Sequence, residues 1–495
     1  MMRIFLVGMM GSGKTTIGRM LSDVLGIPFV DMDEVIEKRE GKQIEKIFVE
    51  NGEEYFRKNE NRLLNELLLE KDVVVASGGG IVLNKQNRKL LEEEKTVFLK
   101  VEPEELMNRV NVENRPLLQG KKERVLKLWN ERRRFYEEFP CVNTTSLTPW
   151  ESVVRVLYEV LEHQEIEVKA YIHPVSLELC GFKKISEYEH VFTTKRLAKL
   201  YGDFFKFEPL ELPDGESAKE FEHVFRCYKH LTDIGFSRED TLVGVGGGAL
   251  TDVAGFVSST FKRGTGLTLF PTTLLAQVDA AIGGKNGVDF AGVKNLIGTI
   301  RMPDLTVIDP VVTLSMDPER FEEGIVEAFK MALISGRGYD EFKNRVGKLK
   351  NREIRSLIKF IKISIEEKSK IVSGDPSDKG QRKCLNLGHT LGHLFEAITK
   401  VPHGIAVAWG MEKEMYFFRR HGMIDERMYE DVMETLGKII DIKIPEIPRK
   451  KAEEFLKNDK KGHPMRIGKI DIPFVKVPGS FEIIQVDPEE LLEVM

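Results

Sequence analysis

The chain has 495 residues, of which 41% are hydrophobic and 31% charged, and its formal net charge is −5. This length exceeds what one hydrophobic core serves, so we expect at least two domains, and no apolar run reaches the roughly 18 residues that span a bilayer. The slight negative charge gives no general attraction to nucleic acid. Four scattered cysteines without CxxC spacing indicate neither disulfides nor a thiolate zinc site and favour a cytoplasmic protein.

Residues 1 to 163 are predicted to form one α/β domain. The apolar runs IFLVG, DVVVAS and TVFLKV predict strands, and segments such as ENRLLNELLLEK predict helices, the pattern of a parallel sheet wrapped by helices. The first run is like a signal peptide in composition, but it leads into a glycine-rich loop and not into a cleavage site. It is therefore predicted to be a strand.

The segment TPWESVVRVLYEVLEHQ predicts the helix that closes this domain. Thr148 is its expected cap, with Pro149 in the first turn and Glu151 three residues after the cap. A new strand is expected in EIEVKAYIHPV. We therefore place the domain boundary near residues 163 to 168.

The stretch GMMGSGKT follows a predicted strand and precedes a predicted helix. Its spacing, GxxxxGKT, is that of a phosphate loop, in which Lys14 reaches the β and γ phosphates and the Thr15 hydroxyl binds Mg²⁺. The sequence therefore predicts a site for ATP with Mg²⁺. Its expected binding residues are Gly11, Ser12, Gly13, Lys14, Thr15 and Thr16.

Residues after this loop limit which molecules could accept the phosphate. The second strand is expected to end in PFVDMD, with Asp31 and Asp33 on one face, and EEYFRKNE, ASGGG and NRPLL follow. Asp33 is suited to a polyol, Arg57 to a carboxylate, and the turn 78–80 to close approach of a flat ring. The predicted substrate is a small hydroxylated acid.

Together these motifs resemble shikimate kinase over residues 1 to about 160. The resemblance implies that ATP phosphorylates shikimate, that Asp31 organises Mg²⁺ and accepts the hydroxyl proton, that Arg115 closes over the transferred phosphate and that Arg109 lies against adenine. It assigns shikimate to Asp33, Arg57, Gly79, Gly80 and Arg132.

Two points stay open in this half. RRRFY lacks the proline that the family commonly has before its aromatic pair, so Arg132, Arg133 and Arg134 are alternatives for the second carboxylate partner. Another small-metabolite kinase, such as a gluconate kinase, is the alternative family. Asp33 with Arg57 and the GGG turn favours shikimate.

Residues 166 to 310 are predicted to continue as α/β structure, and residues 311 to 495 to be mainly helical. In GVGGGALTDVAGF, glycines lie between a strand and a helix and loosely match GxGxxG/A. A standard dinucleotide fold also needs an acidic residue about 20 positions on, which GTGLTLFPTT does not supply. NAD would therefore bind in a variant manner.

Cations gather in glycine-rich segments of this half, where they suit phosphate better than a solvated surface. The stretch FPTTLLAQVDAAIGGKNGVDFAGVKNLIG holds Asp279, Lys285, Lys294 and Asn295. Further cations are Arg263, Lys368, Arg382, Lys460 and Lys461. We expect them to concentrate a phosphorylated, carboxylated substrate.

The stretch NLGHTLGHLFEAITKVPHG carries His389, His393 and His403. A catalytic zinc usually has three protein ligands and one open position. His389 and His393 form an i, i+4 pair without the glutamate of HExxH. Glu327 lies in the apolar GIVEAFKMALI, where an unpaired carboxylate is costly and a metal offsets the cost. The residues alone leave the ligand pair open.

The series GGGALTDVAGF, FKRG, PTTLLAQVDAAIGGK, KNLIG, EGIVEAFK, LNLGHTLGH and HGIAVAWG resembles 3-dehydroquinate synthase through nearly all of residues 166 to 495. The resemblance assigns Zn²⁺, or another divalent ion such as Co²⁺, to Glu327, His389 and His403, and leaves His393 off the metal. It assigns NAD to Glu216, Lys219, Gly246, Gly247, Gly248, Asp252, Thr272, Thr273 and Lys294.

The same resemblance implies a substrate pocket and a homodimer. Arg263 would reach into a neighbouring subunit, and either Lys460 or Lys461 would enter the pocket. The other pocket residues are Asp279, Lys285, Lys294, Asn295, Lys330, Lys368, Arg382 and Asn386. Of these residues and the histidines, catalysis is expected from Lys285, Lys294, Lys330, Lys368 and His393.

The reaction implied for this half converts 3-deoxy-arabino-heptulosonate 7-phosphate to 3-dehydroquinate and phosphate. NAD transiently oxidises the substrate alcohol and is regenerated, while zinc polarises the reacting oxygen. A metal- and NAD-dependent polyol dehydrogenase is the alternative, and it would release NADH. A fusion with one silent half is a third possibility, which the intact motifs of both halves disfavour.

Overall fold

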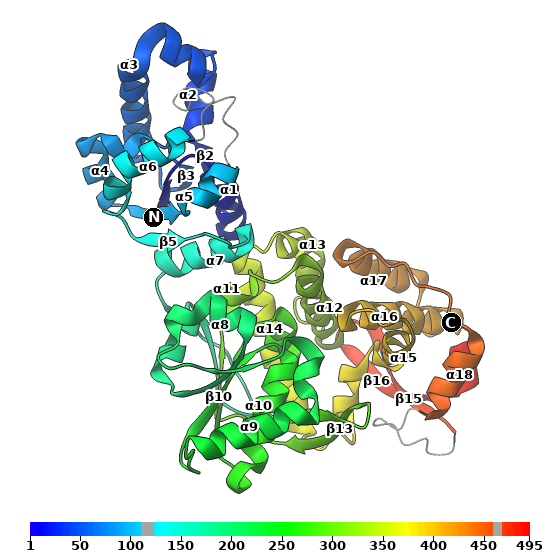
Figure 1. Ribbon diagram of the computed structural model, residues 1–495. Coiled ribbons are helices and arrows are strands. Elements are labelled where there is room, and N and C mark those ends of the chain that lie inside the picture. The colour runs from blue at the N-terminus through cyan, green and yellow to red at the C-terminus, as the bar shows by residue number, and fades with distance from the viewer. Residues whose placement is uncertain (110–122, 459–467) are drawn as a thin grey trace. The chain divides into compact units, whose positions relative to one another are not determined.

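The computed structural model describes residues 1–109, 123–458 and 468–495 (Figure 1). The chain forms two compact units, Met1–Glu162 with Arg352–Ile354, and His163–Asn351 with Arg355–Met495. Within the described ranges, no helix has the length and apolar character needed to cross a membrane.

The first unit is built on a five-stranded parallel sheet of order β2-β3-β1-β4-β5. The central strand β1 is buried from Ile4 to Val7, as the apolar run IFLVG predicts. This confirms the expected α/β fold and a strand at the start of the chain. The strands are β1 (Met2–Val7), β2 (Phe29–Asp31), β3 (Asp72–Ala76), β4 (Lys95–Lys100) and β5 (Cys141–Asn143).

Helices connect these strands, and α1 packs on β3 and α7. The capping box of α7 forms as predicted, with Thr148 Oγ1 accepting from the Glu151 N–H at 3.2 Å. The expectation that Asp33 ends the second strand is wrong, because Asp31 caps a helix that contains Asp33 in its first turn. The helices are α1 (Lys14–Leu25), α2 (Met32–Glu40), α3 (Ile44–Leu67), α4 (Lys85–Glu92), α5 (Pro103–Arg109), α6 (Glu123–Tyr136) and α7 (Pro149–Val160).

The second unit begins with a seven-stranded sheet of order β6-β7-β14-β11-β10-β8-β9. It is parallel except for β6, which runs antiparallel to β7. The predicted strand in EIEVKAYIHPV is confirmed only in part, since β6 ends at Ile166. The strands are β6 (Gln164–Ile166), β7 (Val175–Leu179), β8 (His190–Thr194), β9 (Leu210–Leu212), β10 (Thr241–Gly246), β11 (Gly266–Pro271) and β14 (Leu305–Ile308).

Helix α10 packs against β10 and β11 and also against the antiparallel pair β12 and β13 (Figure 1). The short segment η4 (Gly215–Lys219) contacts the same helix. These elements surround the glycine-rich turn that the sequence singles out. Their bounds are α8 (Lys195–Tyr201), α9 (Phe221–Asp233), α10 (Gly248–Thr260), β12 (Lys285–Phe290) and β13 (Val293–Ile300).

From Pro310 onward the chain is mainly helical, as predicted, but it also contains an antiparallel hairpin, β15 (Ile470–Val477) and β16 (Ser480–Val486), that the sequence analysis missed. Helix α16 packs against both α15 and α12. The helices are α11 (Pro310–Thr313), α12 (Pro318–Ser335), α13 (Tyr339–Lys350), α14 (Ile354–Gly374), α15 (His389–Thr399), α16 (His403–Arg420), α17 (Glu426–Ile439), α18 (Arg449–Asn458) and α19 (Pro488–Leu492).

Candidate active sites

The phosphate loop lies between β1 and α1, where the sequence predicts it. Gly8, Gly11 and Gly13 have φ of 150°, 80° and 90°, values that glycine adopts most readily. The Nζ atom of Lys14 donates to the carbonyl oxygens of Gly8 and Met9, each at 2.9 Å, so the ammonium lies over the loop. An ammonium in this position is suited to the β and γ phosphates of a nucleotide.

Thr15 and Asp31 supply the oxygens expected of a Mg²⁺ site beside the loop. Thr15 Oγ1 donates to Asp31 Oδ2 at 2.6 Å, and Oδ1 of the same carboxylate accepts from the backbone N–H of Asp33 at 3.0 Å. Ser12 is buried and Thr16 is exposed. Hydroxyl and carboxylate oxygens are ligands that Mg²⁺ prefers, so the residues fit this ion.

The expected shikimate pocket is formed by α2, α3 and the turn after β3. Arg57 Nη1 pairs with Glu60 Oε2 at 2.8 Å, and a Cβ at Gly80 would lie 2.1 Å from Arg57 Nη2. A Cβ at Gly78 would lie 2.5 Å from Glu60 Oε1 and 3.0 Å from Asp33 Oδ1. The glycines are therefore required because three charged side chains converge on this turn.

Glu60 is a pocket residue that the sequence analysis did not select. Its side chain is 1% exposed, and burial raises the pKa of its carboxyl group while Arg57 lowers it. Glu60 follows Arg57 by three positions in RKNE, but the same spacing is common on solvated helix faces. Only the tertiary structure distinguishes the two cases.

Among the arginines of ERRRFYEE, Arg132 is the one directed to this turn. Its Nη1 donates to the carbonyl oxygen of Gly79 at 2.9 Å, and its side chain is buried. Arg133 instead pairs with Glu137 at 2.6 Å on the surface, and Arg134 lies over an aromatic ring of α6. The geometry thus favours Arg132 as the second carboxylate partner.

Two further arginines are expected near the nucleotide. Arg109 ends α5, pairs with Glu105 and donates to the carbonyl oxygen of Thr144 at 3.5 Å. Its contact with adenine stays a prediction. Arg115, the expected lid residue, lies outside the described residues.

The glycine-rich turn of the second unit lies between β10 and α10, as predicted. A Cβ at Gly246 would lie 2.7 Å from a leucine Cβ of α10, and one at Gly247 would lie 3.0 Å from Thr273 Cγ2. The backbone N–H of Thr272 donates to the Gly246 carbonyl at 2.9 Å, and Gly248 begins the helix. The turn therefore presents a helix N-terminus bordered by two threonines, a suitable place for a diphosphate.

Lys219 contacts the acidic residues that are expected around NAD. Its buried Nζ lies 2.6 Å from Asp252 Oδ2, 3.0 Å from Asn295 Oδ1 and 3.7 Å from Glu216 Oε2. Burial raises the pKa of Asp252 to about 6, although Lys219 lowers it. Asn295 was expected at the phosphorylated substrate, but the structure places its side chain with this group.

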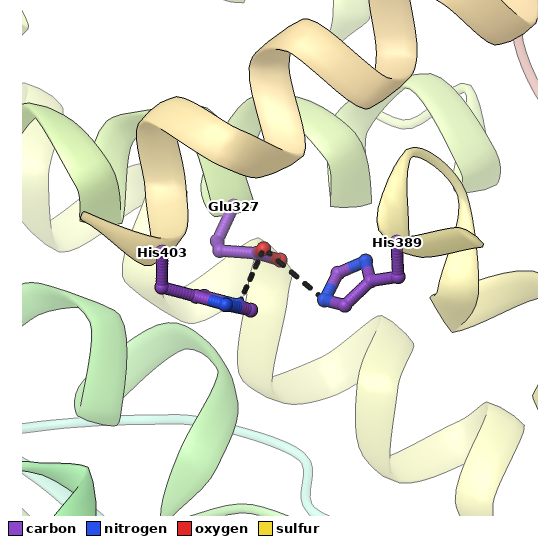
Figure 2. A group of neighbouring side chains, drawn as sticks. All are labelled: Glu327, His389 and His403. Carbon is purple, nitrogen blue, oxygen red and sulfur yellow. Dashed lines mark ion pairs between the residues drawn. The ribbon is translucent and has the colours of Figure 1, made fainter. Parts of the chain in front are cut away.

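Glu327, His389 and His403 form a group in which one ligand atom of each lies within 4.8 Å of the others (Figure 2). Glu327 Oε1 lies 3.7 Å from His389 Nε2 and 4.0 Å from His403 Nε2. Ligand atoms around a tetrahedral zinc lie about 3.3 Å apart, so a small contraction would suffice. Figure 2 shows both rings directed at the carboxylate from opposite sides.

In both imidazoles Nδ1 lies near an oxygen atom, so Nε2 remains available to bind a metal. His389 Nδ1 lies 3.1 Å from the Leu387 carbonyl oxygen, and His403 Nδ1 lies 3.1 Å from Glu396 Oε2. A histidine ligand usually donates its other N–H to such an oxygen, which fixes the tautomer. Burial holds the pKa of His389 well below its usual range, so its ring is neutral, as metal binding requires.

His393 lies beside the group but outside it. Its ring centroid is 5.4 Å from that of His389 and 6.2 Å from that of His403. All three side chains therefore come from one compact region, yet only the first and last meet Glu327. This is the pair that the family resemblance selects and that the local spacing does not.

Glu327 also has a cationic partner on its own helix. Lys330 Nζ lies 2.5 Å from Glu327 Oε2, and both side chains are 1% exposed. The pair comes from one turn of α12, since the residues are three positions apart. Within the described ranges neither oxygen of Glu327 has a hydrogen-bond partner, and Oε1, which is not the oxygen paired with Lys330, lies nearest the two histidines.

Other predicted cations lie in pairs around this group. Lys368 Nζ lies 2.8 Å from Asp279 Oδ1, and Lys285 Nζ lies 2.5 Å from Asp378 Oδ2. Lys330 and Lys368 both contribute to holding the pKa of Asp279 well below its usual range. A half-buried carboxylate among lysines is thereby kept charged. Asp378 was missed, because it lies far from Lys285 in sequence.

Lys294 connects the hairpin β12–β13 to the metal group. Its Nζ lies 2.8 Å from Glu396 Oε1, and the other oxygen of Glu396 accepts from His403. Glu396 was also missed by the sequence analysis. Burial opposes its charge, but His403 and Lys294 lower its pKa to about 2.

The remaining predicted residues are placed as follows. Arg382 is buried and donates to the Gly283 carbonyl at 3.2 Å, and Asn386 precedes α15. Arg263 lines a cavity of about 570 Å³ whose lining includes no member of the metal group. Lys460 and its alternative Lys461 lie outside the described residues.

Three protein-family models together match most of the chain. Residues 10–162 match shikimate kinase, residues 209–323 match 3-dehydroquinate synthase N-terminal, and residues 324–462 match 3-dehydroquinate synthase C-terminal. A solved structure of ValA, a 2-epi-5-epi-valiolone synthase from Streptomyces hygroscopicus subsp. jinggangensis 5008, shares the fold of the second half. It has a TM-score of 0.60 and 21% identity and covers 67% of this chain and 98% of its own.

One sequence relative matches part of this chain, and another matches its whole length. The 3-dehydroquinate synthase of Pyrococcus furiosus is 39% identical over 59% of this chain and 84% of its own. The bifunctional shikimate kinase/3-dehydroquinate synthase of Thermotoga maritima is 52% identical over 100% of both chains. The chain therefore belongs to the family of bifunctional shikimate kinase/3-dehydroquinate synthases.

Proposed function

We propose that this chain phosphorylates shikimate with ATP in its first unit, and converts 3-deoxy-arabino-heptulosonate 7-phosphate to 3-dehydroquinate and phosphate in its second. The observation that carries this proposal is the presence of two separate sets of site residues. One is a phosphate loop next to the Arg57 and Arg132 pocket. The other is the group of Glu327, His389 and His403 among lysines.

In the kinase half, positioning and charge neutralisation supply the catalysis. Lys14 binds the β and γ phosphates, while Thr15 and Asp31 hold Mg²⁺. Arg57 and Arg132 bind the shikimate carboxylate. The backbone at Gly79 lies within reach of the loop, since a Cβ there would be 3.5 Å from the Met10 nitrogen, so the acceptor is held beside the phosphates.

In the proposed kinase mechanism, Asp33 fixes the ring hydroxyls, and Asp31 accepts the proton of the attacking hydroxyl. Gly80 leaves room for the Arg57 guanidinium, and Arg115 closes over the transferred phosphate. Removal of the Asp31 or Asp33 carboxylate should reduce turnover more than folding stability, because these groups act on the bound substrates.

In the synthase half, NAD and Zn²⁺ when bound supply a reversible hydride acceptor and a Lewis acid. Glu327, His389 and His403 hold the metal, and the residues of the glycine-rich turn hold the dinucleotide. Co²⁺ fits the same donor set. His393 stands one turn along α15 from a metal ligand, where it holds or moves a proton for the substrate.

The substrate of the synthase half is held by cations. Lys285, Lys330, Lys368 and Arg382 bind its carboxylate and phosphate oxygens, together with Asp279, Asn386 and Lys460 or Lys461. Lys294 borders both the cofactor and the metal group through Glu396. These side chains exclude water from the site and orient the ring-closing carbons.

The direct test assays the purified chain with each substrate separately. Lys14→Met should abolish shikimate phosphorylation while dehydroquinate formation persists, because the loop lies in the other unit. NADH absorbance should stay near enzyme stoichiometry during dehydroquinate formation, since the overall reaction is redox neutral. Stoichiometric NADH with product would support the polyol dehydrogenase alternative, and equal loss of both activities in the variant would contradict two independent sites.

We also propose that the synthase half forms a homodimer in which Arg263 completes the neighbour's pocket. Its side chain lines a cavity whose lining includes no member of the metal group, which supports this arrangement. Mixing inactive Arg263→Ala and Lys368→Ala proteins should restore part of the dehydroquinate activity. No recovery in a confirmed mixed dimer would count against this arrangement.

We also propose a cytoplasmic location, which the four free cysteines of the chain support.

We propose the boundary near residues 163 to 168, with an NAD-binding part at 166–310 and a metal-binding part at 311–495. Its support is the division of the chain after Glu162. Proteolysis at this join should release two pieces that unfold cooperatively. Unfolding of both pieces upon cleavage would contradict the boundary.

A further inference from the structure

A fully buried glutamate, Glu414 of α16, reaches the start of the neighbouring helix α15. Its Oε2 accepts the backbone N–H of Gly388 at 2.7 Å, and its side chain is 0% exposed. Gly388 has φ 76° and supplies no side-chain cap to α15. The helix that begins at His389 therefore receives its capping oxygen from another helix.

A second buried glutamate, Glu323 of α12, reaches the first turn of α16. Its Oε2 accepts the backbone N–H of Gly404 at 2.9 Å. Pro402, at the cap position of α16, makes no side-chain cap hydrogen bond. The helix that begins at His403 is thus also capped by a carboxylate from a different helix.

The helices touch closely enough to give these carboxylates little freedom. A Cβ at Gly410 would lie 1.9 Å from the Gly388 carbonyl oxygen, and a Cβ at Gly404 would lie 2.5 Å from the Glu323 Cα. Glu414 lies one turn after Gly410 on α16, so the backbone contact sets its reach. The two capping contacts are therefore parts of rigid helix crossings.

We propose that Glu414 and Glu323 are positioning residues that direct His389 and His403 toward the metal, an inference that rests on the proposed metal centre. Each carboxylate fixes the first turn of the helix whose first residue is a ligand. The chain of contacts runs from α12, which also carries Glu327, to α16 and then to α15. All three ligands are thereby held on one connected frame.

Burial raises the pKa of Glu414 to about 8, against the lowering by backbone N–H groups of Gly388, Leu391 and Thr390. Burial likewise raises the pKa of Glu323. Burial of a carboxyl group costs free energy, so a buried carboxyl group depends on its hydrogen bonds to offset that cost. Loss of partners that orient metal ligands typically weakens metal binding by about 10- to 100-fold.

The test isolates the reach of the side chain at residue 414. Glu414→Gln keeps an acceptor oxygen at the same distance from the Gly388 N–H, whereas Glu414→Asp shortens the side chain by one methylene. We expect the Gln variant to bind Zn²⁺ nearly as tightly as the wild type. The Asp variant should bind about 10-fold or more weakly. Zinc affinity is measured on the full chain by competition with a chromophoric chelator.

Glu323→Gln and Glu323→Asp should behave in the same way, because Glu323 also accepts a backbone N–H at the start of a helix that begins with a ligand. Glu412→Asp is the matched control, since Glu412 lies on α16 but accepts from Tyr429 Oη at 3.2 Å. It should leave zinc affinity unchanged. The Co²⁺ absorption spectrum reports ligand geometry directly and should change only in the two Asp variants of the capping residues. The cooperative unfolding transition of the second unit, which carries all these residues, checks that each variant is folded.

Two results would overturn the proposal. One is wild-type zinc affinity in both Asp variants. The other is a Gln variant that loses as much affinity as its Asp counterpart, which is decisive even where an Asp variant does not fold. Failure of the wild-type chain itself to bind zinc would refute the proposed metal centre and is distinguishable from either result.

Discussion

Lys330 Nζ lies 2.5 Å from Glu327 Oε2, and both groups are almost completely buried. The carboxylate that faces His389 and His403 therefore already has one cationic partner. A metal would be its second. This pair determines how the protein should respond to metal removal.

Lys330→Met should destabilise the metal-free protein more than the zinc-loaded protein. Removal of one partner of a buried ion pair costs about 3–5 kcal/mol, and zinc would supply the missing positive charge. Calorimetric unfolding with and without a chelator measures the difference. Lys438→Met, which removes only an exposed pair with Glu434, is the control. An equal loss in both metal states would contradict the expectation.

The three histidines should differ in metal content. His389→Ala and His403→Ala should lose zinc and dehydroquinate formation together, because removal of one of three protein ligands leaves too weak a site. His393→Ala should keep near-stoichiometric zinc and lose turnover. Elemental analysis of the purified variants measures this directly. Zinc lost from the His393 variant but kept by the His403 variant would reverse the assignment.

Arg132→Ala should lower kcat/KM for shikimate by about 10- to 100-fold, the loss expected when a hydrogen bond to a charged group is removed. Arg133→Ala should have little effect, since its partner Glu137 is on the surface. Steady-state kinetics at saturating ATP distinguishes them. The assignment of the carboxylate partner fails if the second variant is the more impaired.

Stability should fall in acid partly because of His173. Its Nε2 lies 3.0 Å from Thr306 Oγ1, and burial lowers its pKa from 6.5 to about 4. The unfolded chain binds the proton more readily, so stability is complete above pH 6.5 and is lost as pH falls toward 4. His173→Gln should remove on the order of 3 kcal/mol of that fall.

Chemical denaturation between pH 7 and pH 4 tests this prediction as a difference from the wild type. His421→Gln, at an exposed position, is the control and should leave the pH profile unchanged. If the His173 variant retains the full wild-type pH dependence, its burial is not the cause.

Local patterns predicted much of the fold. The run IFLVG gave a strand because its side chains are buried on both faces of the sheet, and Thr148 with Glu151 formed its capping box because that motif is complete within four residues. Asp33 was misplaced since a short strand can pass into a helix within one residue. The hairpin β15–β16 was missed in a segment expected to be mainly helical.

Site residues could be predicted from the sequence only where a local motif is sufficient to identify them. Lys14 and Thr15 follow from the loop motif, whereas the contacts of Glu60, Glu396 and Glu414 depend on elements brought together by folding. The choice of His403 over His393 is of the same kind. The grouping of His403 with Glu327 depends on a contact between two helices, and its role as a metal ligand stays a prediction from the family resemblance.

The contact between Gly410 and Gly388 limits how this part of the chain can change during evolution. Many tight packings tolerate a larger residue when its neighbour becomes smaller. Here a Cβ at Gly410 would meet a backbone oxygen at 1.9 Å, and a backbone oxygen has no smaller substitute. No compensating replacement exists at the contact, so any side chain there must move a whole helix, and with it His389.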